Sequence, residues 1–175
     1  YRGHNGEKIL YEDEDGKQRS VRIESSPYMI FNNRFVNGFD YTKFENDGYA
    51  LFIDNDKDGI YESVQINAYT YVEVSGIDRY NGIIGDKNNS AYSIDTSKAK
   101  EKNALIIRDV NGVEISIYSI EHGSILQVKK SDDLYWVEID IIQTSISGTV
   151  SSKGEDGEYF IDEKSAREYA NRLYG

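Results

Sequence analysis

Three aspartates at alternate positions, followed by a glycine, are the residues of this chain whose types and spacing best suit ion binding. They lie in the segment Asp54-Asn-Asp-Lys-Asp-Gly59, between two apolar runs. Ca²⁺ takes six to eight oxygen ligands at about 2.4 Å, and a loop with carboxylates at positions 1, 3 and 5 and Gly at position 6 can wrap around one ion. The spacing predicts a calcium site formed by Asp54, Asp56, Asp58, the carbonyl oxygen of Ile60 and the carboxylate of Glu62.

The loop is not expected to be an EF-hand. An EF-hand requires a Glu at position 12, where this chain has Gln65. The segments that flank an EF-hand loop are helices. Here the flanks alternate like strands, so the segment is interpreted as a calcium-binding hairpin loop. The affinity expected for such a loop is weak, with a Kd on the order of 10⁻⁴ to 10⁻³ M, as in calcium sites of extracellular modules. The alternative is an acidic hairpin tip in which Asp58-Gly59 merely forms the turn.

A second candidate surface is aromatic. Tyr69 and Tyr71 alternate with apolar residues in a strand-like run, and Trp136 is offset from the apolar positions Val137 and Ile139. An exposed row of aromatic rings could stack on sugars or contact a protein partner. The alternative is a sheet buried on both faces, because Tyr is a favourable strand residue in itself.

Charge and composition exclude several classes of function. The net charge of -11 repels nucleic acid and anionic lipid and favours divalent cations as partners. The chain has no cysteine and therefore no disulfide or thiolate metal site. No apolar run reaches the roughly 18 residues that a membrane span needs. Because the sequence starts at Tyr1 without an initiator Met, we expect it to be a piece of a longer protein.

The elements that must position these residues are predicted to be mainly strands. Alternating apolar positions recur every 8 to 12 residues with turn signals between them, which predicts a mostly β fold built of hairpins, as a sandwich or small β-barrels. The run 61–74 is the strongest strand, long enough to pass from one sheet to another. Asn32-Asn33 predicts a tight turn. Residues 85–102 are expected to form a mobile polar loop, and 163–173 a short C-terminal helix.

The domain organisation is predicted from these runs. We expect a hairpin domain over residues 1–100, which contains the acidic loop, and a small barrel-like domain over 101–175, which ends in the helix.

Several segments together resemble β-rich modules of large secreted surface proteins of Gram-positive bacteria, Clostridia-like species above all, which often carry S-layer homology repeats. The segments are the acidic hairpin 51–64, the preceding hairpin 29–36, the strand 69–74 and the later segments 106–128 and 145–150, in the same order over roughly residues 5–162. Residues 85–102 and 163–173 have no counterpart. The resemblance implies an extracellular or cell-surface location, a structural or binding role, and no catalytic residues.

The predicted function is a non-catalytic structural, assembly or adhesion module of a bacterial cell-surface or extracellular protein, stabilised by calcium. An exposed edge strand could pair with another copy or another surface domain and so build a filament or lattice. One alternative is a polysaccharide-binding module that uses Tyr69, Tyr71 and Trp136 on cell-wall glycan. A glycan-active enzyme and a phage tail or spike domain are further alternatives. With 31 acidic residues, no carboxylate pair can be singled out as catalytic.

Overall fold

A computed structural model describes the chain except residues 14, 46, 143–148, 154–158, 162–163 and 166–175. The described chain divides into two compact units, Tyr1–Ile142 and Gln143–Gly175. The helix expected over 163–173 lies outside the described residues, apart from Lys164–Ser165, which form the short strand β14.

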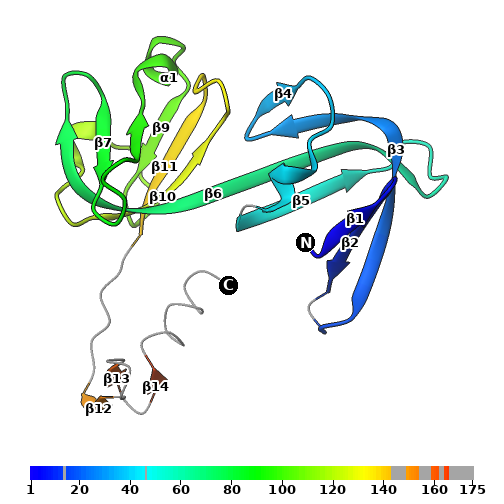
Figure 1. Cartoon of the computed structure of the whole chain (residues 1–175). Helices are drawn as coiled ribbons and strands as arrows, with labels where there is room; N and C mark the ends of the chain where they lie inside the picture. Colours follow the sequence, from blue (N-terminus) through cyan, green and yellow to red (C-terminus); the bar gives the residue numbers. More distant parts are fainter. Residues whose placement is uncertain (14, 46, 143–148, 154–158, 162–163, 166–175) are drawn as a thin grey trace. The chain divides into compact units, whose positions relative to one another are not determined.

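The first unit is mostly β, which confirms the predicted fold class (Figure 1). Its elements are β1 (Gly3–Asn5), β2 (Lys8–Glu12), β3 (Gln18–Phe31), β4 (Arg34–Val36), η1 (Tyr41–Glu45), β5 (Asp47–Ile53), β6 (Ile60–Asp78), β7 (Ile83–Asp86), β8 (Ser93–Asp95), α1 (Ser97–Glu101), β9 (Leu105–Arg108), η2 (Ile117–Ser119), β10 (Ile125–Lys130) and β11 (Val137–Ile142). In the second unit, β12 (Val150–Lys153), β13 (Tyr159–Ile161) and β14 form a separate sheet. None of the described helices is long and apolar enough to cross a membrane.

The eleven strands of the first unit form one open mixed sheet, in which β6 is the shared strand. The first half of β6 pairs in parallel with β3 and antiparallel with β5. Its second half pairs antiparallel with β10 and β7. The long run at 61–74 thus passes from one set of neighbours to another, as its length predicts.

Each half of β6 contributes to a different hydrophobic core. The first core consists of Ile9, Ile23, Met29, Phe31, Val64, Ile66 and Ala68. The second core consists of Val72, Val74, Ile84, Ile94, Ala99, Ile107, Ile117, Ile120, Leu126, Val128, Val137 and Ile139. Because the second core combines residues from both sides of position 100, the packing does not divide the chain at the expected boundary, and the compact units part after Ile142 instead.

Residues 85–102 are not one polar loop. β8 and α1 lie within this segment, and Ile94 and Ala99 are fully buried in the second core. The polar residues around them cover the solvent side of these short elements. Two isolated apolar anchors were too few to reveal either element by periodicity.

Asn32 connects the turn after β3 to both halves of the sheet. The turn Asn32-Asn33 has positive φ at both residues, 43° and 61°, as the sequence predicts. Only 2% of Asn32 is exposed. Its Nδ2 donates to the carbonyls of Ala68 (2.9 Å) and Lys130 (2.8 Å), and its Oδ1 accepts from the N–H of Ala68 (2.8 Å). One buried amide therefore joins β3, β6 and the end of β10.

The Asn32→Ala variant tests this connection. It leaves one buried N–H and two carbonyls without their partner, and we expect the free energy of unfolding to fall by about 3 kcal/mol or more. Asn33→Ala is the matched control, because Asn33 is exposed, has a positive φ and has no recorded side-chain hydrogen bond to any described residue. Its free energy of unfolding should fall by only about 1 kcal/mol, because Asn adopts the left-handed region more readily than Ala does. If urea denaturation shows that both variants lose the same free energy of unfolding, the bridging role of Asn32 is contradicted.

Candidate functional site

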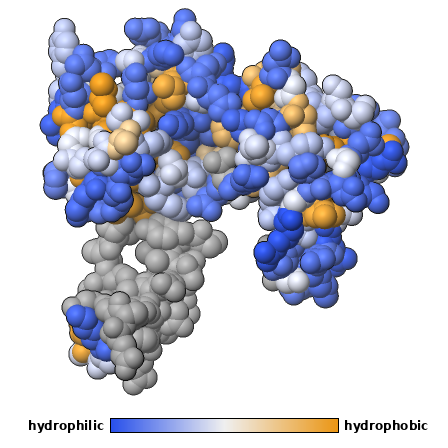
Figure 2. All heavy atoms as spheres, in the orientation of Figure 1, coloured by the Kyte–Doolittle hydropathy of each residue, from blue (hydrophilic) through white to orange (hydrophobic). Residues whose placement is uncertain are grey.

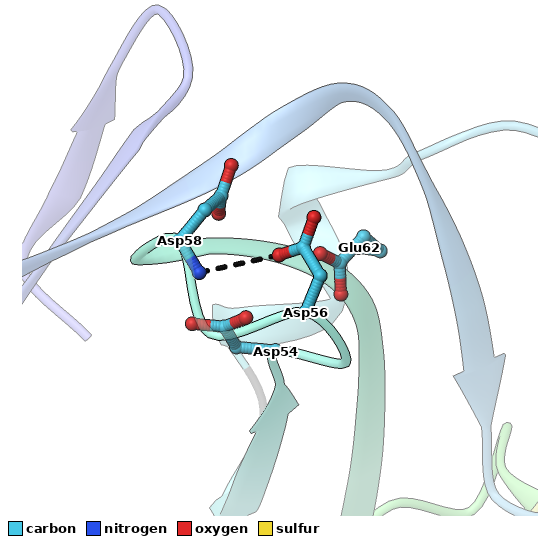
Figure 3. A group of neighbouring side chains, drawn as sticks. All are labelled: Asp54, Asp56, Asp58 and Glu62. Atoms are coloured by element: carbon cyan, nitrogen blue, oxygen red, sulfur yellow. Dashed lines mark hydrogen bonds between the residues drawn. The ribbon is translucent and has the colours of Figure 1, made fainter.

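Four carboxylates gather in the turn that joins β5 to β6. Asp54, Asp56 and Asp58 come from the turn, and Glu62 comes from the start of β6 (Figure 3). One oxygen from each of the four can be chosen so that all lie within 4.8 Å of one another. The structure thus brings together the four carboxylates that the sequence predicts as ligands.

Backbone amides of the turn hold these carboxylates in place. Asp54 accepts hydrogen bonds from the N–H of Lys57 (2.5 Å) and of Gly59 (2.9 Å), one on each oxygen. Asp56 accepts from the N–H of Asp58 at 3.2 Å. These hydrogen bonds hold the carboxylates of Asp54 and Asp56 against the backbone of the turn, because ionised acceptors form strong hydrogen bonds with loop amides.

Two further hydrogen bonds close the turn onto β6. Glu62 accepts from the N–H of Asn55 at 2.8 Å, and Asp58 accepts from the N–H of Ile60 at 2.7 Å. Ile60 is the first residue of β6. Its carbonyl oxygen as a fifth ligand stays a prediction.

The backbone of the turn needs two residues with positive φ, Lys57 at 66° and Gly59 at 87°. Glycine adopts this region without the steric cost that a Cβ imposes. Lys57 bears that cost, and its N–H donates to Asp54. Gly59 was recognisable in the sequence, whereas the conformation of Lys57 was not.

The geometry of this loop could hold a metal ion. Each carboxylate oxygen has two lone pairs, so an oxygen that accepts one N–H can still bind a cation. Four carboxylate oxygens, one from each residue and all within 4.8 Å of one another, are close enough to share one cation. Asp56 and Asp58 are exposed while Asp54 and Glu62 are half-buried, which agrees with a site open to water.

The predicted aromatic residues lie on one face of the sheet but do not form one surface. Tyr69 and Tyr71 are half-buried on β6, with ring centroids 5.5 Å apart in an edge-to-face arrangement. Trp136 is also half-buried and directly precedes β11. Because β10 lies between β6 and β11, one strand separates Trp136 from the two tyrosines.

Charged side chains of β9, β10 and β11 lie on the sheet beside these rings. Arg108 contacts Glu138 at 2.7 Å and Asp140 at 3.0 Å, and Lys129 contacts Glu138 at 3.3 Å. Burial alone would raise the pKa of Glu138, but the hydrogen bonds and charges of Arg108 and Lys129 outweigh it and lower that pKa below its usual value. The aromatic face is therefore interrupted by a compensated ion-pair network.

Sequence reasoning missed an exposed apolar face on the other half of the sheet. The strand order β4-β3-β6-β5 presents Tyr28, Phe35, Tyr49 and Leu51, whose exposed fractions are 53%, 57%, 64% and 53%. Leu51 and Ile53, which share a strand face in the sequence pattern, point to this outer side, while Ala50 and Phe52 pack against the first core. The signal was present, because residues 49–53 are apolar at every position and not only at alternate ones.

Elsewhere the visible surface is mainly hydrophilic, with scattered hydrophobic residues (Figure 2). Comparison with protein-family models, with curated proteins and with solved structures gives no match. The resemblance to Gram-positive surface proteins thus stays a prediction.

Proposed function

We propose that the chain is a non-catalytic structural, assembly or adhesion module of a bacterial cell-surface or extracellular protein, stabilised by Ca²⁺ bound at Asp54, Asp56, Asp58 and Glu62. The observation that carries the proposal is the position of the four-carboxylate turn. It joins β6, the strand shared by both cores, to β5, which pairs with no other described strand. An ion bound there fixes an edge strand to the centre of the sheet.

Calcium fits this turn better than magnesium does. Mg²⁺ requires ligands at 2.0–2.1 Å in nearly ideal octahedral geometry and gives up its waters reluctantly. Ca²⁺ takes six to eight oxygen ligands in flexible geometry, which suits a turn in which four carboxylate oxygens lie within 4.8 Å of one another. Four negative charges close together also repel one another, and a divalent cation relieves that repulsion.

The exposed apolar face supports an assembly role. Tyr28 and Phe35 lie with ring centroids 4.6 Å apart, and Tyr49 and Leu51 lie on the same face of β5. The polar residues Ser63, Gln65 and Asn67 of β6 lie between these two apolar groups. Exposed apolar groups rimmed by polar residues mark interaction sites in soluble proteins. The face and the ion-binding turn thus meet on the same edge strand.

Thermal unfolding with and without calcium tests the ion site. A ligand that binds only the native state stabilises it by about 1.4 kcal/mol at ten times its Kd and about 2.7 kcal/mol at one hundred times. For a domain of this size, we expect 10 mM CaCl₂ to raise the Tm by roughly 3 to 10 °C over a chelator control. MgCl₂ should raise it by clearly less.

Two matched variants make this test specific. Asp56→Asn keeps the Oδ1 acceptor for the Asp58 N–H but removes one charged ligand, so it should abolish most of the calcium shift. Asp109→Asn makes the same change in a turn of similar kind, where Asp109 accepts from the N–H of Asn111 and Val113. It should leave the calcium shift intact. A shift that is absent in the natural sequence, or that survives Asp56→Asn, would refute the site.

The second candidate is a polysaccharide-binding module, which the adjacent rings of Tyr69 and Tyr71 favour. If rings on this face stack on sugar, Tyr71→Ala and Trp136→Ala should each weaken binding to cell-wall polysaccharide on a glycan array by at least about tenfold, in line with the cost of losing an aromatic contact. Tyr80→Ala is the control, because Tyr80 is 92% exposed in a turn away from this face. No array signal for the natural sequence would eliminate this candidate.

A further inference from the structure

An open groove of about 630 Å³ lies beside β5. Its apolar lining comes from β2, β3, η1, β5 and β6 and includes Ile9, Val21, Phe44, Ala50, Phe52 and Ile66. Tyr49, whose side chain points to the other face of β5, lines it as well. Asp47, Gly48, Tyr49, Ala50 and Phe52 of β5 all line the groove, so it runs beside this strand.

The backbone of β6 shows which edge of β5 is open. The carbonyl of Ile66 accepts from the N–H of Asn32, and the N–H of Ala68 donates to the Asn32 side chain. Backbone groups of successive strand residues point to opposite edges. The even-numbered residues in this part of β6 therefore point to β3, and the odd-numbered ones point to β5.

The register then assigns the backbone groups of β5. Leu51 lies opposite Gln65 and exchanges hydrogen bonds with β6, as odd-numbered residues of β5 do. The N–H and C=O groups of Ala50 and Phe52 point away from β6, toward the groove. No described residue provides a backbone partner for them. An edge of this kind is a template for one more strand.

The charged residues that line the groove indicate which charge the added strand should have. Asp47 is exposed at the start of β5 and has no cation within ion-pair distance among the described residues. Glu12 contacts Arg2 at 2.7 Å, and Lys43 contacts Asp132 at 2.8 Å, so these two groups are already compensated. A basic residue opposite Asp47 would complete the pairing. A second copy of this chain, with a net charge of -11, is disfavoured as the occupant.

We propose that the β5 groove binds an extended segment of another polypeptide, with apolar side chains at alternate positions and a basic residue near one end, as an added strand on β5. The inference rests on the proposed assembly function and specifies the chemistry of the partner segment. Main-chain hydrogen bonds to Ala50 and Phe52 supply the register, and the apolar floor of the groove takes every second side chain.

The test titrates the full chain with the capped peptide Lys-Val-Thr-Val-Thr-Val-Lys and follows backbone amides by NMR, with and without Ca²⁺. The amides of Ala50 and Phe52 should shift and become protected from hydrogen exchange, because they gain partners. Ala50→Pro removes only the outward N–H, which an edge strand tolerates, and should weaken binding at least tenfold. Ala50→Ser keeps the N–H and should bind as the natural sequence does.

Reversing the charge of Asp47 tests whether the groove prefers a basic peptide. Asp47→Lys should lower affinity for the basic peptide several-fold and favour the same peptide with Glu at its ends.

The two proposals fail in different ways. If the peptide binds but calcium does not raise the Tm, only the ion site is refuted. If calcium raises the Tm but the peptide does not bind, only the groove is refuted. If the amides of Ala50 and Phe52 become protected at high protein concentration without peptide, the partner is a second copy of this chain and the proposed basic segment is wrong. The same shifts caused by a chitin oligosaccharide, and not by the peptide, would overturn the strand in favour of a sugar.

Discussion

The buried side chain of Asn32 is the interaction on which the arrangement of this sheet depends. A strand of nineteen residues such as β6 would be free to bend between its two cores if nothing fixed its middle. Asn32 fixes it there, because the amide pairs with both backbone groups of Ala68 and also reaches the carbonyl of Lys130. Buried polar groups are costly unless they are fully paired, and full pairing is possible only in one register of β3, β6 and β10.

Fixing β6 also fixes what is attached to it. β5 has no other strand partner in the described chain, so its position follows from β6 and from the turn that joins the two. Gly48 allows this pairing to be close. Its φ is 141°, and a Cβ at this position would lie 2.1 Å from the carbonyl oxygen of Asn67. The edge strand is therefore held at one end by a glycine contact and at the other by the acidic turn.

The features that the sequence predicted are local ones. The alternate aspartates, the paired asparagines and the long alternating run each specify their own backbone geometry, and the structure has them where they were expected. The features that were not predicted depend on distant strands. Nothing within residues 49–53 indicates which side faces a core, because both sides are apolar and the choice is made by β3 and η1. Ile94 and Ala99 likewise have little signal until β7 and β10 surround them.

The acidic turn and the open edge belong to one element, β5, so a change at the turn can alter the edge. A carboxylate cluster without a cation opposes closure of its own turn, because its like charges repel. Neutralising that cluster reduces the freedom of the strand that leads into it. An edge strand that is already ordered loses less conformational entropy when it pairs, so it pairs more favourably. The ion would then contribute to assembly without touching the partner, through the rigidity of the seven residues of β5, which lead from Asp47 to the turn.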